Sequence, residues 1–219
     1  MKKIVLIGLL VVAIMFLGIG CASYNPRTGI PDVKTFQETG IKAVNAEAGI
    51  TIIAYPIQTK EDADMYFDNT SLAKDGLLPV YVNVSVSDIG INKNYRVDSI
   101  LLRVENRNIS TIPADEAYKL IKKSWFGKSS FWWFFGAYIG APISAIHTNS
   151  VNNKIKEDLE KKVAKEGEIK KEGVSGFLYF RIPDDLKSLD DSFLVFALAD
   201  KDSKNLTVKL PLKGAITAK

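Results

Sequence analysis

The sequence predicts a mainly β fold with one helical insertion. Two observations carry this prediction. Six short segments have the pattern of strands, either because apolar and polar residues alternate or because β-branched residues are concentrated there, and turn residues separate them. Between the third and fourth of these segments the apolar period changes to that of a helix. Several short strands at such spacings are typical of an antiparallel β-sandwich, so we expect an immunoglobulin-like sandwich that carries a helical, aromatic-rich hairpin insertion.

Among these segments, 79–87 shows the clearest alternation of apolar and polar residues. The valines from Val80 to Val86 face one way, so we expect that face to be buried and the face from Tyr81 to Ser87 to be more exposed. Alternation, or for 50–57 the content of β-branched residues, predicts strands at 50–57, 79–87, 95–105, 174–182, 192–199 and 206–212.

Two helices are expected inside the insertion, which spans 113–172. Segment 113–124 has apolar residues at helical spacing, a proline at its start and acidic residues in its first turn, where they interact favourably with the helix dipole. Segment 150–165 has an apolar residue at every fourth position and carries Asp158 and Lys162 as a supporting ion pair. Its apolar stripe is narrow, so we expect this helix to dock by one edge.

The segment between the two helices, 125–146, concentrates aromatic side chains. It holds all three tryptophans and four of the eleven phenylalanines, and its part 131–146 has no charged residue. That part is shorter than the roughly 20 residues that a membrane-spanning helix needs, so a hairpin at the membrane interface fits better than a crossing. Three interpretations stay open: packing within the protein, contact with the membrane interface, and self-association or binding of a protein partner. The candidate contact residues are Trp125, Phe126, Phe131, Trp132, Trp133, Phe134, Phe135 and Tyr138.

The first 20 residues predict an export signal. Lys2 and Lys3 precede an apolar run that closes with small residues at Gly20, which is the order of a secretory signal peptide, and the only cysteine, Cys21, follows directly. The segment resembles a bacterial lipoprotein signal peptide, although the leucine of that family's motif lies one position earlier here, at Leu17. The resemblance implies that Cys21 receives a diacylglyceryl group and that its new amine is acylated, for example with palmitate. Two or three acyl chains would anchor the protein in the membrane permanently.

Residues 21–49 are expected to form the lipidated N-terminus and a tether, because turn-forming residues recur there with few apolar residues between them; the alternative for part of this segment is packing as an edge segment. The sandwich domain would then occupy 50–219. Loss of residues 1–20 lowers the formal net charge from +4 to +2, which leaves no strong field to attract nucleic acid. Ala22 stands where an aspartate commonly retains lipoproteins at the inner membrane. The resemblance therefore implies the cell envelope, and the outer membrane in a host with two membranes.

Residues with catalytic or metal-binding chemistry are few. His147 is the only histidine, and without further cysteines a structural zinc site is not expected. The pairs Asp184-Asp185 and Asp190-Asp191 lack the regular alternation of oxygen ligands found in calcium loops. We therefore expect no metal, no cofactor and no enzymatic activity.

The order of segments is similar to that of uncharacterised bacterial envelope lipoproteins with a β-sandwich and a helical insertion. The likeness covers most of 50–212 and rests on the strand 50–57, Leu77-Leu78-Pro79-Val80, Pro113-Ala114-Asp115-Glu116 and Gly176-Phe177-Leu178-Tyr179-Phe180. It implies no activity. We expect a membrane-anchored envelope lipoprotein that acts as a non-enzymatic binding or structural module, with the aromatic hairpin as a candidate membrane contact. The alternative is a small-ligand-binding or hydrolytic envelope protein with a site in the sandwich loops.

Overall fold

The computed structural model describes the chain in several stretches. These are residues 24–27, 40–88, 92, 94–122, 140–164, 169, 173–202 and 204–214, with side chains of the helix that begins at residue 140 described from Asn149 onward. The chain forms two compact units, Met1–Tyr24 with Lys123–Asn153, and Asn25–Lys122 with Lys154–Lys219. The described part of the first unit is Tyr24 and a helical stretch, residues 140–153. Among the helices that the structure describes, none combines the length and the apolar character needed to cross a membrane.

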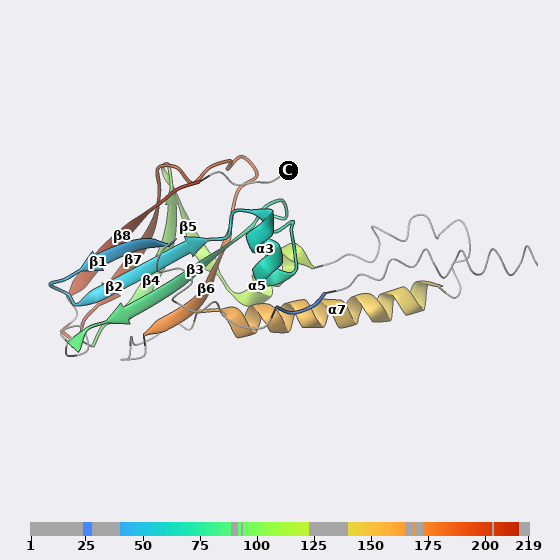
Figure 1. Ribbon diagram of the computed structural model, residues 1–219, viewed down its shortest axis with the longest axis horizontal. Helices are drawn as coiled ribbons and strands as arrows, with labels where there is room; N and C mark the ends of the chain where they lie inside the picture. Colours follow the sequence, from blue (N-terminus) through green and yellow to red (C-terminus); the bar gives the residue numbers. More distant parts are fainter. Residues whose placement is uncertain are drawn as a thin grey trace, which may run out of the picture. The chain divides into compact units, whose positions relative to one another are not determined.

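The second unit is built on eight antiparallel strands in one nearly closed sheet (Figure 1). The strands are β1 (Ile41–Asn45), β2 (Ile50–Pro56), β3 (Leu77–Val86), β4 (Arg96–Val104), β5 (Arg107–Ile112), β6 (Val174–Arg181), β7 (Ser192–Ala199) and β8 (Asn205–Leu212). Their hydrogen-bonded order is β1-β2-β3-β6-β5-β4-β7-β8, and the two end strands, β1 and β8, approach each other without pairing. The predicted mainly β, antiparallel fold is confirmed.

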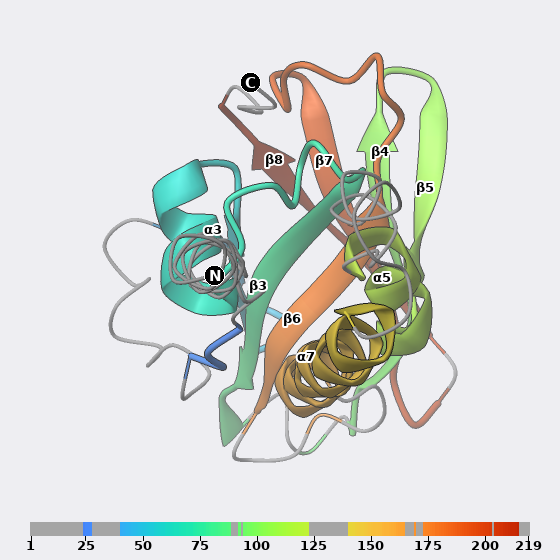
Figure 2. The same cartoon turned by 90° about the vertical axis from the view of Figure 1, so that its right-hand side faces the viewer.

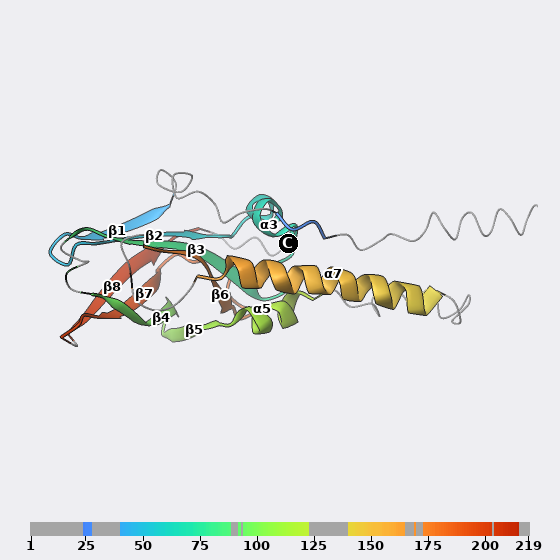
Figure 3. The ribbon, with the colours of Figure 1, turned by 90° about the horizontal axis from the view of Figure 1, so that it is seen from below.

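The main core lies inside this sheet and comes from alternate residues of the strands. Val80, Val82 and Val84 of β3 are buried, as the sequence predicts, and they belong to one apolar cluster with Leu102 of β4 and Phe196 of β7. Figure 3 shows β1, β2 and β3 on one side of the unit and β4 and β5 on the other. Each fully buried aliphatic side chain contributes about 1.5 to 3 kcal/mol, so this cluster is the principal source of stability.

The opposite face of β3 is also buried over most of its length, and the expectation of exposure is wrong there. Tyr81 is 0% and Asn83 is 7% exposed, whereas Ser87 at the strand's end is exposed. The Tyr81 ring lies 5.6 Å from the ring of Phe177 on β6, and Phe177 lies 4.9 Å from Phe67 of α3 (Lys60–Phe67). Helices cover this part of the sheet, so β3 is a central strand that is buried on both faces.

Three helices lie on this outer surface of the sheet, and Figure 2 shows α3, α5 (Ala114–Ile121) and the C-terminal part of α7 (Gly140–Lys162) beside β3 and β6. α3 begins at Thr59, whose hydroxyl accepts a hydrogen bond from the Asp62 N–H at 3.1 Å. α5 begins after Pro113, as predicted. In α7, Ile155 and Leu159 are buried while the residues on the other side are exposed, so the predicted docking by one edge is confirmed.

The end of α7 runs directly onto β6. Val163 forms a parallel bridge with Phe177, and the Ala164 N–H donates to the Phe177 carbonyl at 2.9 Å. This close approach requires Gly176, which has φ 149°, because a Cβ there would lie 2.6 Å from the Ala164 nitrogen. The contact attaches the insertion to the sheet at its C-terminal end.

Candidate functional site

An open groove lies where β5 separates from β6. β5 pairs with β6 only through its last two residues, whereas Arg107 to Ser110 pair with β4. β6 ends at Arg181, and Pro183 has no backbone N–H with which to continue the pairing. The groove between them has a volume of about 470 Å³ and is lined by Arg107, Asn108, Ile109, Arg181, Ile182 and Pro183.

One wall of the groove is an edge of the sheet. Arg107 to Ser110 use one side of their backbone to pair with β4, so their remaining backbone groups point toward the groove. Asn108, which lines the groove, is exposed. Such an edge can hydrogen-bond an extended segment of another molecule.

The two arginines of the groove differ in their surroundings. Arg107 Nη1 lies 3.2 Å from both carboxylate oxygens of Asp185, and Nη2 lies 3.8 Å from Glu105. The hydrogen bond with Asp185 raises the pKa of Arg107 and lowers the pKa of Asp185. The exposed guanidinium of Arg181, in contrast, makes no hydrogen bond or ion pair with any residue that the structure describes. Among the described residues, Arg107 is thus held by a carboxylate, whereas Arg181 has no carboxylate partner.

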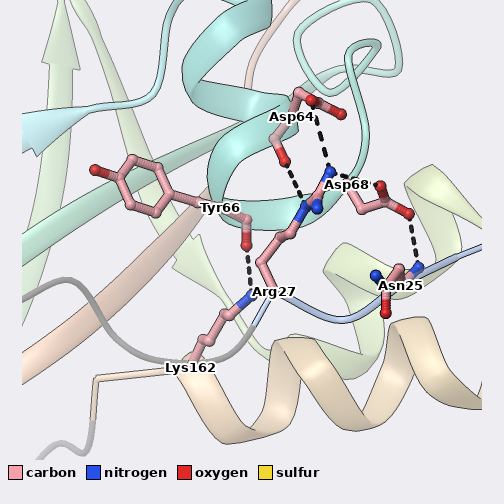
Figure 4. Close-up of polar contacts among 6 residues, drawn as sticks. All are labelled: Asn25, Arg27, Asp64, Tyr66, Asp68 and Lys162. Carbon is pink, nitrogen blue, oxygen red and sulfur yellow. Dashed lines mark hydrogen bonds and ion pairs between the residues drawn. The ribbon is translucent and has the colours of Figure 1, made fainter.

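A second polar site forms where residues 25–27 lie against α3 (Figure 4). Arg27 Nη2 lies 3.2 Å from Asp68 Oδ1 and 3.7 Å from Asp64 Oδ2, and its Nε donates to the Asp64 carbonyl at 3.3 Å. The Asn25 N–H donates to the other oxygen of Asp68 at 2.7 Å. We call Asn25, Arg27, Asp64 and Asp68 the N-terminal clamp.

Asp68 is the central residue of the clamp, and the end of α3 fixes its position. It has φ 47° and is the C-cap residue, with its backbone N–H bonded to the Asp64 carbonyl at 3.0 Å. Both oxygens of its carboxylate accept hydrogen bonds from the N-terminal segment, and its side chain is only 20% exposed. Charge-assisted hydrogen bonds of this kind are about twice as strong as neutral ones.

A buried ammonium group lies beneath the same helix. Lys162 is 3% exposed, and its Nζ donates to Asp158 at 2.7 Å and to the backbone carbonyl of Tyr66, and lies 5.0 Å from the centre of the Phe67 ring. Burial lowers the pKa of Lys162, and the hydrogen bond and charge of Asp158 oppose this shift. Lys162 therefore joins α7 to α3, and its hydrogen bonds leave it little freedom for other chemistry.

Tyr179 belongs to the same buried region. Its hydroxyl donates to the Leu159 carbonyl at 3.0 Å, and burial, with a smaller contribution from the charge of Asp158, raises its pKa well above the ordinary value. This phenol stays protonated and acts as a hydrogen-bond donor that holds α7 on β6.

The residues predicted to contact lipid or a partner lie outside the described part of the chain. These are Cys21, Trp125, Phe126, Phe131, Trp132, Trp133, Phe134, Phe135 and Tyr138. His147 falls within α7, and its side chain is not among those described.

The acidic pairs Asp184-Asp185 and Asp190-Asp191 serve loop contacts instead of a shared site. Asp185 pairs with Arg107, while Asp190 accepts hydrogen bonds from the Ser188 hydroxyl at 2.7 Å and from the Gly214 N–H at 3.2 Å. Across the residues that the structure describes, no three His, Cys, Asp or Glu side chains come together in an arrangement that could hold a metal ion.

Sequence reasoning missed the clamp and the groove. Arg27 and Asn25 lie in the segment 21–49 that we expected to be a tether, and the same segment contains β1. Thr59 with Asp62 three positions later was an available capping signal for α3. No local signal pairs Arg27 with residues about forty positions away.

No protein-family model matches the sequence, and neither the curated proteins nor the solved structures show a significant similarity to it.

Proposed function

We propose that this protein is a membrane-anchored envelope lipoprotein that acts as a non-enzymatic binding module, with the groove as its contact site. The observation that carries the proposal is Arg181, an exposed guanidinium without a partner among the described residues, beside the unpaired edge of β5. A guanidinium next to backbone donors suits a carboxylate or phosphate group on a partner, because it can form two parallel charge-assisted hydrogen bonds.

The same geometry favours binding over the hydrolytic alternative. Hydrolysis by general acid and base catalysis needs a group that can take up or release a proton near neutral pH. The walls of the groove carry two arginines and an asparagine, and the neighbouring carboxylate of Asp185 is held by Arg107. A groove of this composition attracts an anionic group without offering a base to activate water.

A titration with two anionic probes tests the groove. We expect inorganic phosphate and a short poly-glutamate peptide, added to the full chain in detergent micelles, to shift the backbone amide resonances of Arg107 to Ser110 and of Arg181. Arg181→Ala should abolish these shifts. Arg96→Ala, which removes an exposed arginine paired with Asp98 on β4, should leave them unchanged. Shifts spread evenly over the surface would overturn the assignment of the groove.

Asp185 offers a second, opposite test of the same site. Because its carboxylate competes with an incoming anion for Arg107, Asp185→Asn should tighten phosphate binding. Weaker binding in this variant would indicate that the groove does not use Arg107.

The anchor is part of the proposal and depends on Cys21. The signal-like order of residues 1–20 and the small residue Gly20 before Cys21 support it, and Ala22 supports residence in the outer membrane if the host has two membranes. Cys21→Ser should abolish labelling by a radioactive fatty acid and either release the protein from membranes or leave an unprocessed precursor. Unchanged acylation in this variant would refute lipidation at Cys21.

We also propose that the nearly closed sheet is an immunoglobulin-like sandwich. The neighbours β2-β3-β6-β5 and β4-β7-β8 follow the strand order of the two sheets of a constant-type immunoglobulin domain, with β1 as an additional strand beside the first. In that family a disulfide bridges the two sheets between the strands that correspond to β3 and β7. A cysteine pair at Val82 and Leu194 or at Val82 and Phe196 should therefore oxidise without loss of the fold, and failure of both pairs would count against the sandwich.

A further inference from the structure

We propose that the N-terminal clamp fixes the α3 end of the sheet at the membrane surface, so that the turn between β1 and β2 points away from the bilayer. The partner of the α3 end is therefore a lipid surface. This inference rests on the proposed lipidation of Cys21.

The length of the chain before the clamp sets the greatest possible distance between Cys21 and the clamp. Four residue steps separate Cys21 from Asn25, and an extended chain spans at most about 14 Å over this length. If the clamp and the packing of the buried Tyr24 were both released, the chain from Cys21 to Gly40, where the described structure resumes, would set an upper limit of about 65 Å. The clamp therefore converts a long tether into a short one.

The clamp combines several polar contacts, and the buried side chain of Tyr24, 5% exposed, directly precedes them. Asp68 uses both carboxylate oxygens, one for the Asn25 N–H at 2.7 Å and one for Arg27 at 3.2 Å. Arg27 adds the Asp64 carbonyl and carboxylate. These groups belong to two short segments, so losing Arg27 removes most of the clamp at once.

The position of α3 at one end of β2 then determines which end of the sheet lies near the lipid. α3 follows the end of β2 at Pro56, and β2 extends about 20 Å back to Ile50. Ala46, in the turn between β1 and β2, lies at this far end, and Figure 1 shows the turn and α3 at opposite ends of the sheet. An anchor held near α3 thus leaves Ala46 farther from the bilayer than α3.

The charge of α3 argues against attraction to an anionic lipid surface as the cause of this placement. The helix carries one cationic residue, Lys60, and three acidic ones, Glu61, Asp62 and Asp64. An acidic helix is repelled by anionic headgroups within about one Debye length, roughly 8 to 10 Å. Loss of the clamp should therefore let this end move away from the membrane.

Energy transfer from the protein to the membrane surface tests the orientation. The lipidated full chain is reconstituted in vesicles of phosphatidylcholine and anionic phosphatidylglycerol that contain a headgroup-labelled acceptor lipid. A donor dye is placed at Met65→Cys, because Met65 of α3 is 59% exposed, or at Ala46→Cys in the distal turn. The native thiol of Cys21 does not compete, because lipidation consumes it. We expect stronger transfer from position 65 than from position 46.

Variants of the clamp complete the test. Arg27→Ala and, independently, Asp68→Asn should lower transfer from position 65 by about twofold or more, because the upper limit on the span of the chain then rises from about 14 Å toward about 65 Å. Arg27→Lys should restore part of it, and Arg96→Ala should change nothing. Equal transfer from positions 65 and 46, or transfer from position 65 that is insensitive to both clamp variants, would overturn the orientation. A chain that does not float with the vesicles would instead refute the anchor, which separates the two failures.

Discussion

The ammonium of Lys162 lies 2.7 Å from the carboxylate of Asp158, one turn earlier on α7, and the two side chains are only 4% and 6% exposed. Most i, i+4 pairs on helices lie at the surface, as Lys156 with Glu160 does on the same helix. The buried pair is different because its charges have left water, so each charge depends on the other and on the surrounding hydrogen bonds.

Replacement of one member of this pair should be far more costly than replacement of both. Asp158→Leu leaves a buried ammonium without its carboxylate and should lower the free energy of unfolding by about 3 to 5 kcal/mol. Asp158→Leu with Lys162→Met removes both charges and should recover most of this loss. Urea denaturation of the two single variants and the double variant measures the coupling, and purely additive losses would contradict it.

Gly176 should tolerate no side chain. A Cβ at this position would lie 2.6 and 2.7 Å from backbone atoms of Ala164, which cannot move without displacing the end of α7. Gly76 is a matched control, because it also has positive φ but a Cβ there would meet only a carbonyl oxygen at 3.6 Å. We expect Gly76→Ala to cost about 1 kcal/mol for its backbone conformation alone and Gly176→Ala to cost at least about twice as much. Equal unfolding midpoints would show that α7 does not depend on this approach.

Tyr55 should make stability fall at alkaline pH. Burial, followed by the charge of Asp62 and the hydrogen bond that Tyr55 donates to it, raises the pKa of Tyr55 from 10.0 to about 12. The unfolded chain loses this proton first, so the contribution is fully present below pH 10 and is lost as the pH rises toward 12. Between these values the urea midpoint of the parent should fall more steeply than that of Tyr55→Phe. Parallel curves for the two proteins would contradict the assignment.

Contact with the membrane interface is one of the three interpretations of segment 125–146, and it makes a distinct prediction. A form of the chain without residues 1–20 and with Cys21→Ser, which carries neither the lipid anchor nor the apolar signal segment, should still bind liposomes, with a blue shift of its tryptophan emission. Trp132→Ala with Trp133→Ala should reduce this shift and leave the unfolding midpoint unchanged. If the two rings are instead internal packing, each truncation should cost about 3 to 5 kcal/mol, and liposomes should not change the emission.

The elements that could be predicted are those in which buried residues recur at a regular spacing along the sequence. Six of the eight described strands follow from alternation or, for β2, from the content of β-branched residues, because these strands place one face on the core and the other against water or helices. β5 was missed because its residues, Arg107–Ile112, line the groove and the seam between strands, where polar side chains are tolerated, so the segment has few apolar residues. β1 was anticipated only as an edge segment without bounds within 21–49, since it is a short end strand after a turn-rich segment.

The helical cover explains the remaining errors. α3 has only two buried residues, Ala63 and Phe67, so its sequence is too polar to show an apolar stripe. Without α3, the face of β3 that carries Tyr81 would be exposed, as its alternation suggests. The sequence does pair Asp158 with Lys162, but their burial depends on Phe67 and Tyr66, which come from a distant part of the chain.

The chain leaves the sheet after β5 and returns to it at β6, and these two strands are neighbours. The two ends of the insertion therefore lie next to each other in the sheet, and we call the chain between β5 and β6 the cassette. Lengthening such a cassette adds only about 0.6 kcal/mol of closure entropy for each doubling. The strand order can thus persist while the cassette changes in length and composition, which leaves the helices and the aromatic segment free to diversify separately from the sheet that carries them.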